Sequence, residues 1–165
     1  MFMNNINWTH MNILNKNIQR AGKILSIILL VLFILCLVST GFDIFSLMNG
    51  QTGEEIAHFS GEILGNLFVA GMLFLAWMMF WNIGREYTPF SPKHTLYLRL
   101  ISLLMLAYTI IVPPVEMLMT EILAPGVEAS ASIELSGIVC AVIFYCLALI
   151  FEYGRLLQKQ SDETM

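Results

Sequence analysis

The feature that most constrains this chain is an uncharged run of 19 residues, Ile24 to Phe42. Fourteen of these residues are Leu, Ile, Val or Phe. A helix of roughly 20 residues crosses about 30 Å of hydrocarbon, so a run of this length and composition predicts a helix that spans a lipid bilayer. A cleaved signal peptide is the alternative, but no small-residue cleavage site follows the run. We therefore predict that residues 24–42 form a retained first span.

Three more apolar runs of similar length follow. The second, residues 63–83, carries two tryptophans near one end, where such rings prefer the membrane interface. The third, residues 100–119, contains Pro113 and Pro114, and we expect a kink or break there because proline removes a backbone donor. The fourth covers residues 133–151. The chain of 165 residues is 58% hydrophobic and 12% charged, and its pattern predicts an all-α integral membrane four-helix bundle in contact with the lipid bilayer.

The basic residues predict the orientation of these spans. Lys and Arg flank the spans in three segments. The other two connections contain no Lys or Arg, and Asp and Glu are their only residues among Asp, Glu, Lys and Arg. Cytoplasmic loops retain Lys and Arg, so both termini are predicted to be cytoplasmic, with residues 1–23 as an N-terminal segment and residues 152–165 as a tail. The net charge of -4, without a basic stripe, argues against direct nucleic acid binding. The eight basic residues are Lys16, Arg20, Lys23, Arg85, Lys93, Arg99, Arg155 and Lys159.

No pattern in the chain predicts catalysis, a metal site or a cofactor. The three cysteines lie inside predicted spans, and their odd number and their spacing fit neither a disulfide framework nor a zinc site. Metal-protease, serine-hydrolase, P-loop and dinucleotide motifs are absent from the sequence. A weak metal-ligand pattern is formed by Glu55, His58 and Glu62, but the second motif that a di-iron bundle needs is missing. We therefore expect a protein that is not an enzyme.

Two carboxylates lie within the predicted spans, Glu116 and Glu134. Ionisable residues inside a membrane are candidates for function. The third span runs outward and the fourth runs inward, so we expect both side chains at a similar depth in the outer third, where they can face each other. Two like charges in a low dielectric favour the binding of a proton or a cation. The alternative is that both carboxylates reach the headgroups and are hydrated.

The connection between the second and third spans, residues 84–98, contains two prolines. Ser91 followed by Pro92 is typical of a helix start, with Ser as the cap and proline in the first turn. We expect the third helix to begin near Pro92. His94 would then lie at headgroup level, solvated, with a role as a pH sensor as the weaker alternative.

Two short motifs bear on the family. The first is the turn formed by Thr88, Pro89, Phe90 and Ser91, and the second is the tail with Phe151, Gly154, Leu157, Gln158, Asp162, Glu163 and Thr164. With four spans, these motifs resemble a bacterial membrane family known as domain of unknown function 2975. The resemblance implies an integral protein of the bacterial inner membrane without an assigned reaction. It also points to the cytoplasmic turn and tail as the recurring features.

The sequence leaves three functions open. We expect a regulatory or protein-interaction component without catalysis, whose partner is another protein or a second copy of the chain. A small proton- or cation-coupled transporter or channel subunit that uses Glu116 and Glu134 is the first alternative. An immunity or resistance protein that binds a cationic peptide is the second. In the first hypothesis the docking residues are Pro89, Phe90, Gly154, Leu157, Gln158, Asp162 and Glu163.

Overall fold

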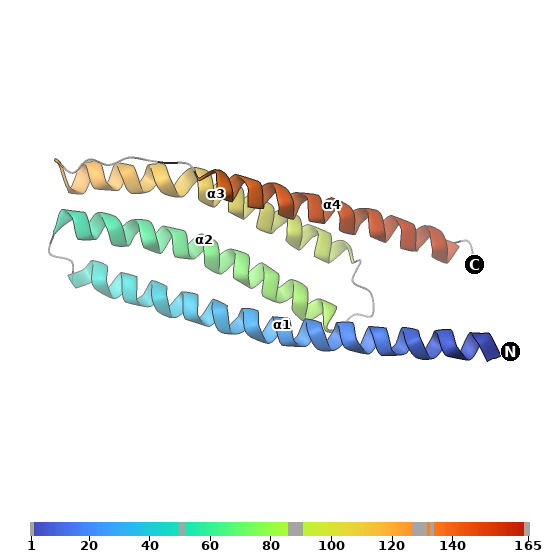
Figure 1. Cartoon of the computed structure of the whole chain (residues 1–165). Coiled ribbons are helices and arrows are strands. Elements are labelled where there is room, and N and C mark those ends of the chain that lie inside the picture. The colour runs from blue at the N-terminus through green and yellow to red at the C-terminus, as the bar shows by residue number, and fades with distance from the viewer. Residues whose placement is uncertain (1, 50–51, 86–90, 127–131, 133, 164–165) are drawn as a thin grey trace.

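The computed structural model describes residues 2–49, 52–85, 91–126, 132 and 134–163, with the backbone alone for residues 2–15 and 162. These residues form four helices, α1 (Phe2–Asn49), α2 (Gly53–Ile83), α3 (Pro92–Leu123) and α4 (Leu135–Glu163). The helices run up and down along a common direction, so α1 begins and α4 ends at the same end of the molecule (Figure 1). The chain is therefore all-helical over the part that the structure describes.

Each of the four helices is long and apolar enough to cross a membrane. In the most apolar stretch of each helix no more than 33% of the residues are buried inside the protein, so large apolar side chains face outward along all four. Exposing that much apolar surface to water is unfavourable, whereas lipid accommodates it. These are the features of a multi-pass membrane protein.

The predicted spans coincide with segments of these helices. Residues 24–42, 63–83 and 100–119 lie wholly inside α1, α2 and α3, whereas α4 begins only at Leu135. The start of the predicted fourth span, residue 133, lies outside the described residues. Each helix is longer than its predicted span, because the helix extends through polar residues beyond the apolar run.

The start of α3 agrees with the sequence pattern. Ser91 is the N-cap, with an extended backbone, and Pro92 follows in the first turn. The Ser91 side chain makes no capping hydrogen bond, and the Ser91 carbonyl accepts from the backbone N–H groups of His94 and Thr95. His94, however, is fully buried, so the expectation of a solvated imidazole at headgroup level is wrong. Burial at this position depends on how the helices pack, which the sequence of the segment alone does not encode.

The break expected at Pro113 and Pro114 is absent, because α3 continues through both prolines to Leu123. A proline lacks the donor that would bond the carbonyl four residues before it, which leaves the carbonyls of Thr109 and Ile110 without their usual helical donors. Membrane helices tolerate such positions where neighbouring helices and hydroxyl groups surround them. The Thr109 and Thr120 hydroxyls donate to the Met105 and Glu116 carbonyls, each at 2.9 Å, so neither hydroxyl bonds the two carbonyls that lose their donors.

Close packing joins successive helices, α1 to α2, α2 to α3 and α3 to α4, over the described part of the chain. Two glycines allow especially close approach. A Cβ on Gly53 would lie 1.7 Å from the Leu123 carbonyl oxygen, and one on Gly137 would lie 2.2 Å from the Thr109 hydroxyl. Small residues let helix backbones approach in this way in membranes.

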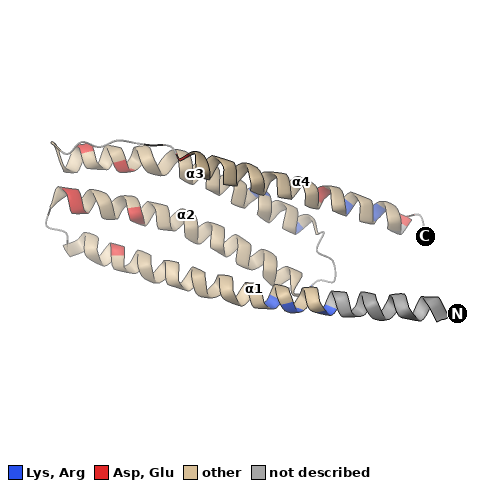
Figure 2. Cartoon of the chain, in the orientation of Figure 1, with Lys and Arg blue, Asp and Glu red and all other residues tan. Residues whose placement is uncertain are grey.

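Charge separates the two ends of the molecule. All eight Lys and Arg residues lie toward the end where α1 begins and α4 ends, which we call the basic end (Figure 2). A cluster of Met79, Ile83, Leu98 and Ala148 fills the space between α2, α3 and α4 near that end. The opposite end, called the acidic end, carries Asp43, Glu54, Glu55, Glu62, Glu116 and Glu121.

Candidate functional site

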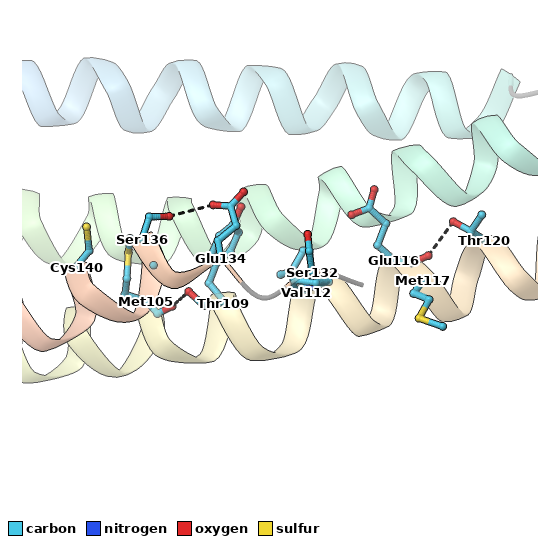
Figure 3. A pocket seen from close by; sticks show the side chains of 13 residues that line it. Met105, Thr109, Val112, Glu116, Met117, Thr120, Ser132, Glu134, Ser136 and Cys140 are labelled. Carbon is cyan, nitrogen blue, oxygen red and sulfur yellow. Dashed lines mark hydrogen bonds between the residues drawn. The ribbon is translucent and has the colours of Figure 1, made fainter. Parts of the chain in front are cut away.

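A pocket of about 540 Å³ lies between α3 and the beginning of α4 (Figure 3). It follows α3 from Met105, near the middle of that helix, to Thr120, near the acidic end. Both carboxylates singled out from the sequence line it, Glu116 from α3 and Glu134 from the segment just before α4. No Lys or Arg is among the residues that line the pocket. The pocket is therefore acidic, because no Lys or Arg among its described lining residues balances the charge of the two carboxylates.

The pocket exists because α4 begins beside the middle of α3. Gly137, in the first turn of α4, packs against Thr109. One turn further along α4, the Ala141 carbonyl accepts a buried hydrogen bond of 2.8 Å from the Ser102 hydroxyl of α3. These two contacts set an antiparallel register in which α4 covers the half of α3 toward the basic end. On α3 the pocket wall extends from Met105 to Thr120.

Glu116 lies where α2 and α3 cross. A Cβ on Gly61 of α2 would be 3.0 Å from the Glu116 Cγ, so the glycine makes room for this side chain. His58 Nδ1 is 4.0 Å from Glu116 Oε1, and His58 Nε2 is 3.6 Å from Glu62 Oε1. The imidazole therefore lies between two carboxylates of different helices. All three side chains are 43–60% exposed, so these pairs are partly hydrated.

Glu134 lies closer to the middle of the molecule than Glu116. Figure 3 shows its side chain beside Thr109, whereas Glu116 lies farther toward Thr120, with Val112 and Ser132 between them. The Ser136 hydroxyl lies 3.3 Å from Glu134 Oε2 and donates to it. The late start of α4 accounts for this difference in depth. The two carboxylates share one pocket but are spread along it.

A second, smaller pocket of about 310 Å³ adjoins the first on the side of α1 and α2. Asp43 and Glu62 line it, and the Asn66 amide donates a hydrogen bond of 2.8 Å to Asp43 Oδ2. The two pockets have three lining residues in common: Tyr108, Val112 and Glu116. Asp43 was not among the residues selected from the sequence. The signal that could have identified it is an acidic residue directly after the first span, paired with an amide inside the second.

Glu55, one of the three residues of the weak metal-ligand pattern, has a structural role at the start of α2. Glu55 belongs to a capping box at the start of α2, in which its carboxylate accepts from the Thr52 N–H and its own N–H donates to the Thr52 hydroxyl. Within the described ranges, no group of three or more His, Cys, Asp or Glu side chains is placed to hold a metal ion. The acidic residues of the pockets are therefore distributed rather than convergent.

The residues proposed for docking lie at the basic end. Pro89 and Phe90 lie outside the described residues, and only the backbone of Asp162 is described. Gly154, Leu157, Gln158 and Glu163 lie on the last turns of α4, which extend past the first residue of α3 (Figure 1). Leu157 is exposed, and Glu163 pairs with Lys159 at 3.7 Å. An ion pair between Arg99 and Glu152 holds α4 against α3 just before this extension.

Comparison with protein-family models, curated proteins and solved structures finds no match to this chain. The resemblance to the bacterial family 2975 remains a prediction from the sequence.

Proposed function

We propose that this chain is a non-enzymatic, regulatory protein of the bacterial inner membrane that binds a cationic ligand in the pocket between α3 and α4. The observation that carries the proposal is the presence of Glu116 and Glu134 on the wall of one pocket, with no Lys or Arg among the described residues that line it. Carboxylates at membrane depth are costly unless they are paired or hydrated, and a bound cation satisfies them. The positive-inside rule places the acidic end outside the cytoplasm, so the ligand enters from there.

The packing supports binding more than passage. The pocket ends near Met105 and Cys140, and farther toward the basic end an apolar cluster around Met79 and Leu98 fills the space between the helices. A site that is open on one side and closed on the other suits a receptor whose ligand changes the packing of α4 on α3. The exposed Leu156 and Leu157 on the projecting end of α4 then supply a surface for a protein partner.

Ligand binding is tested by thermal unfolding of the purified full chain with increasing butylammonium chloride, at constant ionic strength. A ligand that binds the folded state raises the unfolding temperature. We expect this rise in the natural protein and its loss in Glu116→Gln combined with Glu134→Gln. Glu121→Gln is the matched control, because Glu121 is an exposed carboxylate of α3 outside both pockets. An equal rise in the double variant and the control would contradict the proposal.

The partner is tested by cross-linking in native membranes and mass spectrometry of the proteins captured. A stoichiometric partner that is lost when the chain is cut after Gly154 supports the docking surface on α4. Capture of the same partner by the shortened chain would place docking elsewhere. In that case Pro89 and Phe90 are substituted next.

Transport of a cation is the second candidate. The pocket reaches Met105, about halfway along α3, so its polar lining extends well into the spanning part of the helix. A transporter needs a further state that opens toward the basic end. Flux into liposomes that depends on Glu116 and Glu134 would favour this function over a purely regulatory one.

A further inference from the structure

The two pockets meet along one stripe of α3. Tyr108, Val112 and Glu116 are spaced four residues apart, which places them on the same face of the helix, and all three line both pockets. The larger pocket beside α4 and the smaller pocket beside α1 and α2 therefore adjoin along this stripe. The shared stripe extends about 12 Å along the helix axis.

Carboxylates lie on both sides of this stripe and on it. Glu134 lines only the larger pocket, Asp43 and Glu62 line only the smaller one, and Glu116 lines both. Between the acidic groups the walls carry Val112 and the ring of Tyr108, whose face attracts a cation. Neither pocket has Lys or Arg among its lining residues.

A distributed set of negative charges fits a ligand whose positive charges are also distributed. A single metal ion needs convergent ligands, and the described residues offer no such group. A single ammonium group would reach the carboxylates of one pocket and leave those of the other without a cationic partner. A flexible chain with amino groups separated by methylene units can place charges in both pockets and its apolar segments against Val112 and Tyr108.

We infer that the two pockets form one elongated site for a linear polyamine, with one amino group near Glu134 and Glu116 and another near Asp43. This inference rests on the proposed function, because it specifies which cation that site binds. The Asn66 amide fixes the Asp43 carboxylate at the far end of the site through the 2.8 Å hydrogen bond. Glu116 lies at the junction, where it can contact either amino group.

The test measures binding to the full chain in nanodiscs of uncharged phosphatidylcholine by calorimetry, at constant ionic strength. The probes are spermidine, 1,4-diaminobutane and butylamine. We expect spermidine to bind about tenfold or more tightly than butylamine, since a charge-assisted contact is gained in the second pocket. Asp43→Asn should abolish most of that preference. The Asn side chain can still accept the hydrogen bond from Asn66, so this variant preserves the packing of α1 on α2.

The outcomes separate the two proposals. Equal affinities for spermidine and butylamine, or an unchanged preference in Asp43→Asn, would overturn the polyamine inference. The proposed function would still stand if Glu134→Gln weakened butylamine binding. If no probe bound, or if Glu116→Gln with Glu134→Gln left all affinities unchanged, the proposed function itself would fail, and the inference with it. Glu121→Gln serves again as the control for a lost surface charge.

Discussion

Gly137, which lines the pocket, determines how closely α4 approaches α3. Its missing side chain leaves room for the Thr109 hydroxyl, which in turn donates to the Met105 carbonyl at 2.9 Å. A threonine is stiff about its first side-chain torsion, so it cannot move away without losing that bond. The distance between the two helices beside the pocket therefore depends on one residue of each helix.

Gly137→Ala should lower the free energy of unfolding by about 1–3 kcal/mol, because the added Cβ overlaps Thr109 and forces the helices apart. The measurement is denaturant unfolding of the chain in detergent. Gly41→Ala is the matched control, since a Cβ at Gly41 meets nothing within 4 Å. Its effect should stay within about 1 kcal/mol. Adding Thr109→Ala to Gly137→Ala should restore part of the stability, and strict additivity of the two effects would argue against this contact.

The sequence could identify some site residues and not others, for a physical reason. Glu116 and Glu134 stand out because a charge inside an apolar run is rare and costly. Asp43 and Gly61 acquire their roles only from the packing of separate helices, which periodicity within one helix does not encode. The depth of Glu134 was misjudged for the same reason, because it depends on the register between α3 and α4.

At the scale of elements, the beginning of α2 is held by a capping box. The Thr52 hydroxyl accepts from the Glu55 N–H at 3.3 Å, and the Glu55 carboxylate accepts from the Thr52 N–H at 3.4 Å. These bonds satisfy two donors that a helix start leaves open. They also fix the register of α2, on which His58 and Gly61 face Glu116.

Thr52→Ala should cost about 1 kcal/mol of stability, as the loss of an N-cap residue usually does. Thr40→Ala removes the same atoms from the interior of α1, where the hydroxyl bonds only the Cys36 carbonyl of its own helix. We expect a smaller effect there. Hydrogen exchange of the first turn of α2 provides the measurement, with faster exchange expected for Thr52→Ala. Equal exchange in both variants would show that the cap contributes little.

The helices themselves were the most predictable part of the fold. Long apolar runs and a serine–proline start indicated four helices and the position of Pro92 as the beginning of α3. Of the kink or break expected at Pro113 and Pro114, the break is wrong, because the rule for soluble helices does not count the packing that surrounds a membrane helix. The kink stays a prediction. His94 was misplaced because burial at the start of α3 depends on neighbouring helices.

At the scale of the whole molecule, the separation of charge predicts one orientation. All Lys and Arg residues lie toward the basic end, where α1 begins and α4 ends (Figure 2). Fusions of a fluorescent reporter that folds only in the cytoplasm should therefore fluoresce at both termini. A fusion in the connection between α1 and α2 should be dark. Fluorescence from that connection, with dark termini, would mean the opposite orientation.

We propose that the pocket between α3 and α4 is a water-filled site reached from outside the cytoplasm. The most direct measurement is the rate at which a membrane-impermeant maleimide labels single cysteines in intact cells, after Cys36, Cys140 and Cys146 are replaced by alanine. Leu103→Cys is the control, because Leu103 lies on the same helix and is 62% exposed on a surface that we assign to lipid. We predict rapid labelling of Glu116→Cys from outside and none of Leu103→Cys. Labelling of Glu116→Cys only from the cytoplasmic side, or no faster than Leu103→Cys, would contradict the account.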